Sequence, residues 1–103
     1  MDINQIAANI IAYAGDAQSY AMESVGLARQ LKFKDAADKL EKAKESALKA
    51  HRYHTDLIAL GARDENIKIN LLVVHASNHL SVAETLITMA ELFVELKEEI
   101  KKC

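Results

Sequence analysis

The chain has 103 residues, a length that suits one small domain, and half of its residues are apolar although only 5% are aromatic. The formal net charge of -2 leaves no surplus of lysine and arginine to neutralise phosphates, which argues against nucleic acid as a partner. Proline is absent and glycine occurs three times, so the composition favours long, uninterrupted helices.

The first helix is predicted from about residue 3 to residue 31. Gly15 and Gly26 weaken this prediction only modestly. Apolar residues recur at steps of three and four, as a single buried helical face requires: Ile3, Ile6, Ile10, Ala14, Ala17, Ala21, Val25 and Ala28. A turn is expected within residues 30–33, where the composition marks it only weakly.

The second helix is predicted from about residue 33 to residue 60. Its apolar face comprises Ala36, Ala37, Leu40, Ala43, Ala47, Ala50, His54, Leu57 and Ile58. Gly61 suits the position just past a helix end, where a positive φ is favoured. Residues 62–66 are charged and amide-rich, which predicts a loop.

The third helix is expected to begin between Asn66 and Asn70, either of which can cap it, and to end near Cys103. This helix carries two apolar stripes on roughly opposite sides. One stripe comprises Leu71, Val74, Asn78, Val82, Thr85, Met89, Leu92 and Leu96. The other comprises Ile69, Leu72, Val73, Ala76, Leu80, Ala83, Ile87, Ala90 and Val94.

Three long helices and two short connections predict an all-α fold, an up-down-up antiparallel three-helix bundle that forms a single domain over residues 1–103. Such a bundle has an interior for only one of the two stripes on the third helix. We therefore expect the other stripe to meet further subunits.

The compartment is expected to be the cytoplasm. Asp2 and Asn4 stand where a basic secretory leader would be, and no apolar run approaches the roughly 20 residues of a membrane helix. The only cysteine, Cys103, is the last residue and has no internal partner for a disulfide, which indicates a reducing environment. Its thiol is expected to be inert.

His75 and His79 are the most informative residues, because their spacing places two imidazoles one turn apart on the third helix, between the two stripes. An imidazole nitrogen can attack a phosphoryl group and hold it as a reactive phosphoramidate. Two alternatives remain open, a hydrogen-bonded structural pair and a metal site that also uses His51 and His54. The metal site lacks the glutamate of the His-Glu-x-x-His motif.

The segment around the two histidines resembles a known signature. Residues 71–80 read Leu-Leu-Val-Val-His-Ala-Ser-Asn-His-Leu. They are similar to Leu-Leu-Leu-Val-His-Ala-Gln-Asp-His-Leu, the signature of the IIA component of the lactose/cellobiose/chitobiose class of the bacterial sugar phosphotransferase system. Residues 14–23 and 50–58 resemble the Ala-Gly-Asp-Ala-x-Ser…Ala-Met-Glu and Ala-His-x-x-Gln-Thr-x-Leu-Ile segments of the same family.

The resemblance implies a homotrimer of three-helix subunits and a phosphohistidine intermediate. His75 matches the histidine that accepts a phosphoryl group from the phosphocarrier protein HPr. His79 matches the second histidine of the phosphate pocket. The group then passes to a cysteine of the cognate IIB component, and the membrane IIC component takes up the sugar. The transported sugar does not follow from the sequence, because the IIA component never touches it.

The chain departs from the family pattern at several positions. Asn78 replaces the aspartate that, in the family, gathers around a divalent cation on the trimer axis, so we expect no metal and no other cofactor. Ser77 replaces the glutamine before it and is expected to alter the phosphate pocket or the choice of partner. Val82 and Met89 are expected beside Asn78 on the axis. The alternative function is a regulatory trimer that has lost efficient transfer.

Overall fold

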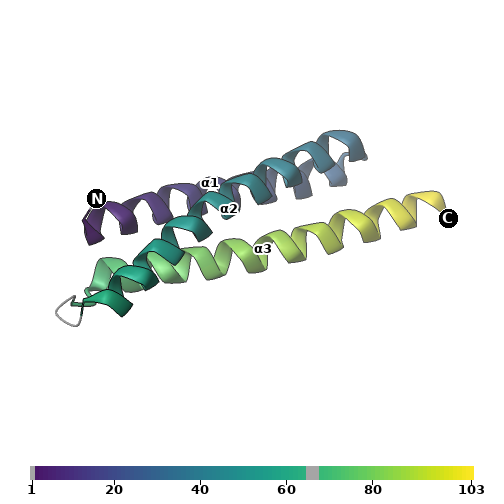
Figure 1. The fold of residues 1–103 in the computed structure, drawn as a ribbon. Coiled ribbons are helices and arrows are strands. Elements are labelled where there is room, and N and C mark those ends of the chain that lie inside the picture. Colours follow the sequence, from purple (N-terminus) through teal and green to yellow (C-terminus); the bar gives the residue numbers. More distant parts are fainter. Residues whose placement is uncertain (1, 65–67) are drawn as a thin grey trace.

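The computed structural model describes residues 2–64 and 68–103, which form three long α-helices and, within these ranges, no strand. They are α1 (Ile3–Arg29), α2 (Phe33–Arg63) and α3 (Leu71–Lys102). Figure 1 shows the helices side by side, with the N-terminus at the end where α2 gives way to α3 and the C-terminus at the opposite end. The predicted all-α fold is confirmed. Across the described part of the chain, none of the helices is long and apolar enough to cross a membrane.

Side-chain caps fix the starts of α1 and α3. Asp2 accepts a hydrogen bond from the backbone N–H of Gln5, and the Gln5 side chain accepts one from the Asp2 backbone, which forms a reciprocal capping box. Asn70 accepts from the backbone N–H of Val73 at 3.0 Å and is the N-cap of α3. Of the two predicted caps, Asn70 is therefore confirmed, whereas Asn66 lies outside the described residues.

The connection between α1 and α2 is a tight turn closed by backbone hydrogen bonds. Leu31 has a φ of 65°, and its N–H donates to the carbonyl of Ala28, while Lys32 donates to the carbonyl of Leu27. This is the Schellman pattern, in which the left-handed position is normally glycine. The turn lies within residues 30–33 as predicted, but α1 ends two residues before the expected Leu31 because the chain reverses there.

The prediction for the end of α2 is wrong. Gly61 lies inside the helix and has no positive φ, and Ala62 and Arg63 are helical instead of forming a loop. The helix ends only at Asp64, whose backbone is extended and whose N–H donates to the carbonyl of Leu60. The remainder of the predicted loop includes residues 65–67, which lie outside the described residues.

The core is a narrow seam built largely from alanine, which lets helices approach closely. Its members follow the predicted faces of all three helices: Ile6, Ala7, Ile10, Ala14, Ala17, Ala21, Ala28, Ala36, Leu40, Ala43, Ala47, Ala50, Leu57, Val73, Ala76, Leu80, Ala83, Ile87, Ala90 and Val94. Four residues predicted on these faces are exposed instead, namely Ala37 and Ile58 of α2, Ile69 just before α3, and Leu72 of α3. Ile3, Val25 and His54 are only partly buried.

Polar contacts between helices reveal their relative directions. Lys44 pairs with Glu91 and His51 with Glu84, so residue numbers rise along α2 as they fall along α3. Asn70 donates to Asn4 at 2.9 Å, which places the starts of α1 and α3 together. Helix α2 is therefore antiparallel to α3, and α1 is parallel to α3.

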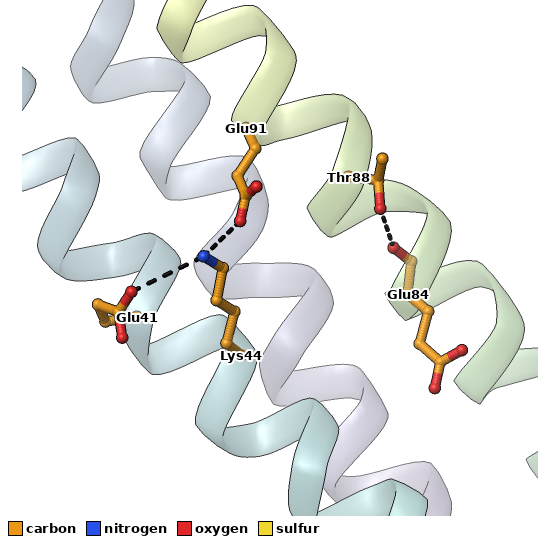
Figure 2. A network of polar contacts seen from close by, with 5 residues as sticks. All are labelled: Glu41, Lys44, Glu84, Thr88 and Glu91. Carbon is orange, nitrogen blue, oxygen red and sulfur yellow. Dashed lines mark hydrogen bonds and ion pairs between the residues drawn. The ribbon is translucent and has the colours of Figure 1, made fainter.

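One ion pair stands out between α2 and α3. Figure 2 shows the Lys44 ammonium between the Glu91 carboxylate of α3 and the Glu41 carboxylate one turn away on α2. The hydrogen bond to Glu91 raises the pKa of Lys44 above its ordinary value. Because both partners remain partly exposed, this pair contributes little to the stability of the fold.

The second stripe of α3 is exposed, as expected for a face that the bundle does not bury. Leu71 is 83% exposed and Met89 59%, and Val74, Val82, Leu92 and Leu96 are exposed as well. The total accessible surface is 6702 Å², whereas a compact protein of this mass exposes about 5,800 Å². The excess accompanies a rod-like shape of 58 × 18 × 17 Å.

Candidate functional site

His75 and His79 lie one turn apart near the start of α3, on the arc between the buried and the exposed stripes. Their Nε2 atoms are 3.1 Å apart, and the two rings meet edge to face with centroids separated by 4.5 Å. His75 is exposed and His79 is half-buried. The structure therefore brings the two predicted site histidines into direct contact, with the outer ring open to a reaction partner.

A residue of α1 determines how the His79 ring is held. The side-chain nitrogen of Gln18 lies 3.2 Å from the His79 backbone oxygen and 3.3 Å from His79 Nδ1. A carbonyl oxygen can only accept, so the group facing it is the NH₂ of Gln18 and not its carbonyl. The same NH₂ then donates to Nδ1, which places the proton of a neutral His79 on Nε2.

This proton position propagates to His75. His79 Nε2–H donates to His75 Nε2, so the latter carries a lone pair and the proton of a neutral His75 is on Nδ1. The unprotonated nitrogen of an imidazole is its nucleophile. The chain of contacts from Gln18 through His79 therefore ends on a nucleophilic nitrogen at the protein surface.

The surroundings of His75 join the site to the exposed stripe. His75 borders a shallow pocket of about 460 Å³. The pocket is otherwise lined by Leu71, Leu72, Val74 and Asn78. Its apolar lining and open shape suit contact with another protein surface better than enclosure of a small molecule.

Ser77 lies on a different side of α3 from His75. Its hydroxyl is 3.2 Å from Nε2 of His54 on α2. Both residues line a separate pocket of about 300 Å³ with apolar residues of all three helices. The His54–Ser77 contact gives the polar ring of His54 a partner on the apolar face of α2, where it is only partly buried. The structure does not bring Ser77 together with the two site histidines, so its predicted part in the phosphate pocket has no support within one chain.

Asn78, Val82 and Met89 all lie on the exposed stripe of α3. A divalent cation bound there would find one neutral amide oxygen per chain, whereas hard cations favour several oxygen ligands that include carboxylates. The donor set thus fits a divalent cation poorly. His51 and His54 contact Glu84 and Ser77 respectively, and the described residues contain no cluster of three His, Cys, Asp or Glu side chains arranged to hold a metal ion.

The family described as "PTS system, Lactose/Cellobiose specific IIA subunit" matches residues 5–98. The chain belongs to this family. The lichenan-specific phosphotransferase enzyme IIA component of Bacillus subtilis (strain 168) is 39% identical over 99 residues, which cover 96% of this chain and 90% of that protein. The lactose-specific EIIA component of Staphylococcus epidermidis is 32% identical over 101 residues, covering 98% and 94% respectively.

A solved structure of the lactose/cellobiose IIA family gives the same result for the fold. The crystal structure of the cellobiose-specific enzyme IIA from Bacillus anthracis has a TM-score of 0.92 and 36% identity, and covers 99% of this chain and 94% of that one. Membership confirms the resemblance found in residues 71–80. It makes the protein a component of a sugar-transporting phosphotransferase system, with a transferase role.

Gln18 is the site residue that the sequence did not reveal. It contacts His79 across 61 positions of sequence, and no local pattern encodes such a contact. One signal was available, because Gln18 lies within the Ala14–Ser19 segment that resembles the IIA family and next to the buried Ala17. A polar side chain at the edge of a buried helical face usually has a polar partner on a neighbouring helix.

Proposed function

We propose that this IIA subunit is a cytoplasmic phosphocarrier that accepts a phosphoryl group from HPr on His75 and passes it to a cysteine of a cognate IIB component. The membrane IIC component would then use that group during sugar uptake. The observation that carries the proposal is the contact between His75 Nε2 and His79 Nε2, in which an exposed nucleophile is held by a ring that is itself fixed by Gln18.

The transfer step follows from the proton positions. The lone pair on His75 Nε2 attacks phosphorus, a new P–N bond forms, and the P–N bond to the donor imidazole breaks. The donor ring, protonated on its other nitrogen, leaves as neutral imidazole, while His75 keeps its proton on Nδ1 and carries the phosphoryl group. His79 Nε2–H, released from His75 Nε2, then donates to a phosphoryl oxygen.

The active form is proposed to be a homotrimer of up-down-up bundles that assembles through the exposed stripe of α3. Supporting this, six large apolar side chains of the stripe are exposed in one chain, and the accessible surface exceeds that of a compact protein. His75 borders the pocket that opens on this stripe, so assembly would place each phosphorylation site beside a neighbouring subunit.

No cofactor is required in this scheme, and assembly is proposed to need no divalent cation. Three Asn78 amides brought together carry no net charge, so no cation is needed to offset repulsion. Their NH₂ groups can donate to neighbouring carbonyl oxygens, which offers a neutral ring of hydrogen bonds or a site for water.

The decisive experiment supplies phosphoenolpyruvate, enzyme I and HPr and follows intact mass for an acid-labile phosphate adduct. The wild type should gain one phosphoryl group per chain, and His75→Gln should gain none while retaining its helical circular dichroism, because glutamine is a good helix former. A wild-type protein that assembles but takes no phosphoryl group would favour the alternative, a regulatory trimer, which the departures at Ser77 and Asn78 leave open. Labelled His75→Gln would refute the assignment of the acceptor.

A further inference from the structure

We infer that Gln18 is a positioning residue, which sets the tautomer of His79 and thereby keeps Nε2 of His75 as the reactive nitrogen. The inference deepens the proposed function and rests on it where transfer is concerned. The tautomer of His79 can be tested independently of any transfer.

The first step of the argument is the double contact of one amide group. A single NH₂ of Gln18 has two hydrogens and two acceptors at 3.2 and 3.3 Å, the backbone oxygen and the Nδ1 of His79. Rotating the amide by 180° would place its carbonyl oxygen against the backbone oxygen, where neither can donate. The backbone contact therefore fixes the orientation of the amide, and the amide in turn fixes the ring.

The second step is the effect on His75. Without Gln18, a neutral His79 could carry its proton on either ring nitrogen, and with the proton on Nδ1 its Nε2 lone pair would face the lone pair of His75 Nε2 across 3.1 Å. Two acceptors at that separation repel, so one ring would turn away or His75 would move its own proton to Nε2. A turned ring loses the hydrogen bond between the two histidines, and a shifted proton moves the lone pair of His75 to Nδ1. In either case His79 no longer donates to a nucleophilic Nε2 of His75.

The third step concerns burial, since a tautomer is fixed only where water does not compete. Gln18 and His79 are both partly shielded and lie between α1 and α3, next to the buried Ala17 and Leu80. His75, by contrast, is exposed, and its ring contacts that of His79. Gln18 of α1 therefore fixes the ring of His79, and His79 in turn positions the exposed ring of His75.

The test compares wild type, Gln18→Met and Gln18→Glu. Methionine keeps the length of glutamine but cannot donate, and glutamate can only accept. Nitrogen-15 NMR of labelled histidines at about pH 8.5, where an ordinary imidazole is neutral, reports which ring nitrogen carries the proton. Wild-type His79 should be protonated on Nε2, Gln18→Met should show a mixture, and Gln18→Glu should move the proton to Nδ1. The rate of labelling from phosphorylated HPr should fall about three- to tenfold in Gln18→Met, as expected for the loss of one neutral hydrogen bond.

Gln30→Met is the matched control, because it makes the same change at an exposed residue just after α1, at the end of the helix far from the two histidines. It should leave the tautomer and the labelling rate unchanged. The inference is overturned if wild-type His79 carries its proton on Nδ1, or if Gln18→Met preserves both the tautomer and the rate. A wild type that is not labelled refutes the proposed function instead, and the NMR result still decides the role of Gln18. Should Gln18→Met fail to fold, Gln18→Glu, which keeps a polar side chain of the same length, gives the same decision.

Discussion

At the scale of single residues, the site separates two tasks between two similar rings. His75 offers an exposed nucleophilic nitrogen, whereas His79 is held by α1 and supplies a donor. Because only the first ring would form a bond to phosphorus, mutations of the two should have different consequences.

His79→Gln should slow labelling from phosphorylated HPr by about a hundredfold, because the glutamine NH₂ lacks the ring that Gln18 holds in place and is no longer a preorganised donor to a charged transition state. The adduct should still form on His75, since the nucleophile remains. Quenched-flow mass spectrometry measures this rate, with His54→Gln as the control because it makes the same substitution away from the two rings. An adduct that disappears in His79→Gln and survives in His75→Gln would reverse the two roles.

The sequence predicted the two histidines but only part of their environment. Helical spacing alone placed His75 and His79 together, because residues four apart share a helix face whatever the tertiary fold. Gln18 and the His54–Ser77 contact depend on how α1 and α2 pack against α3, which no local pattern specifies. Ser77 therefore appeared to belong with its neighbours in sequence, whereas packing directs it to α2.

At the scale of helices, the periodicity of apolar residues predicted the elements well, and the exceptions occur at their ends. The Asn70 cap and the buried stripe of α3 follow from side-chain chemistry and spacing. The left-handed backbone at Leu31 and the continuation of α2 past Gly61 do not, because a leucine stands where glycine is usual and a glycine stands inside a helix.

Leu31→Gly should stabilise the protein by about 0.5 to 1 kcal/mol. A left-handed backbone costs a side-chain-bearing residue roughly 1–2 kcal/mol, and the greater freedom of glycine in the unfolded chain cancels part of the gain. Urea unfolding at fixed protein concentration measures the change. Leu31→Ala is the control, because it removes the half-exposed side chain without relieving the backbone. A lower midpoint for the glycine variant than for the alanine variant would contradict this account.

At the scale of the whole molecule, one chain leaves an apolar stripe uncovered along α3, and the proposed trimer would bury it. Met89→Lys should dissociate such a trimer at low micromolar concentration, because three ammonium groups would be desolvated close together, each at a cost of several kcal/mol. Multi-angle light scattering gives the mass directly. Thr88→Lys adds the same charge beside the stripe and should remain trimeric. A monomeric wild type at these concentrations would rule out the assembly.

The metal dependence of assembly tests the proposed role of Asn78 in the trimer. EDTA should leave the mass and the melting temperature of the wild type unchanged, because Asn78 adds no charge that a cation must neutralise. Asn78→Asp should create a trimer that weakens in EDTA and recovers with magnesium, since three carboxylates repel one another until a cation bridges them. A wild-type melting temperature that falls markedly in EDTA would show that the amides do recruit an ion.

The elongated shape of the single chain has a hydrodynamic consequence. Its length is about three times its width, and its radius of gyration of 16.2 Å exceeds the roughly 13 Å of a compact chain of this size. A rod experiences more friction than a sphere of equal mass, so a free subunit should elute early from a sizing column and sediment slowly. Three such rods packed side by side would form a particle of similar length but greater width. The friction per unit mass should therefore fall when subunits associate.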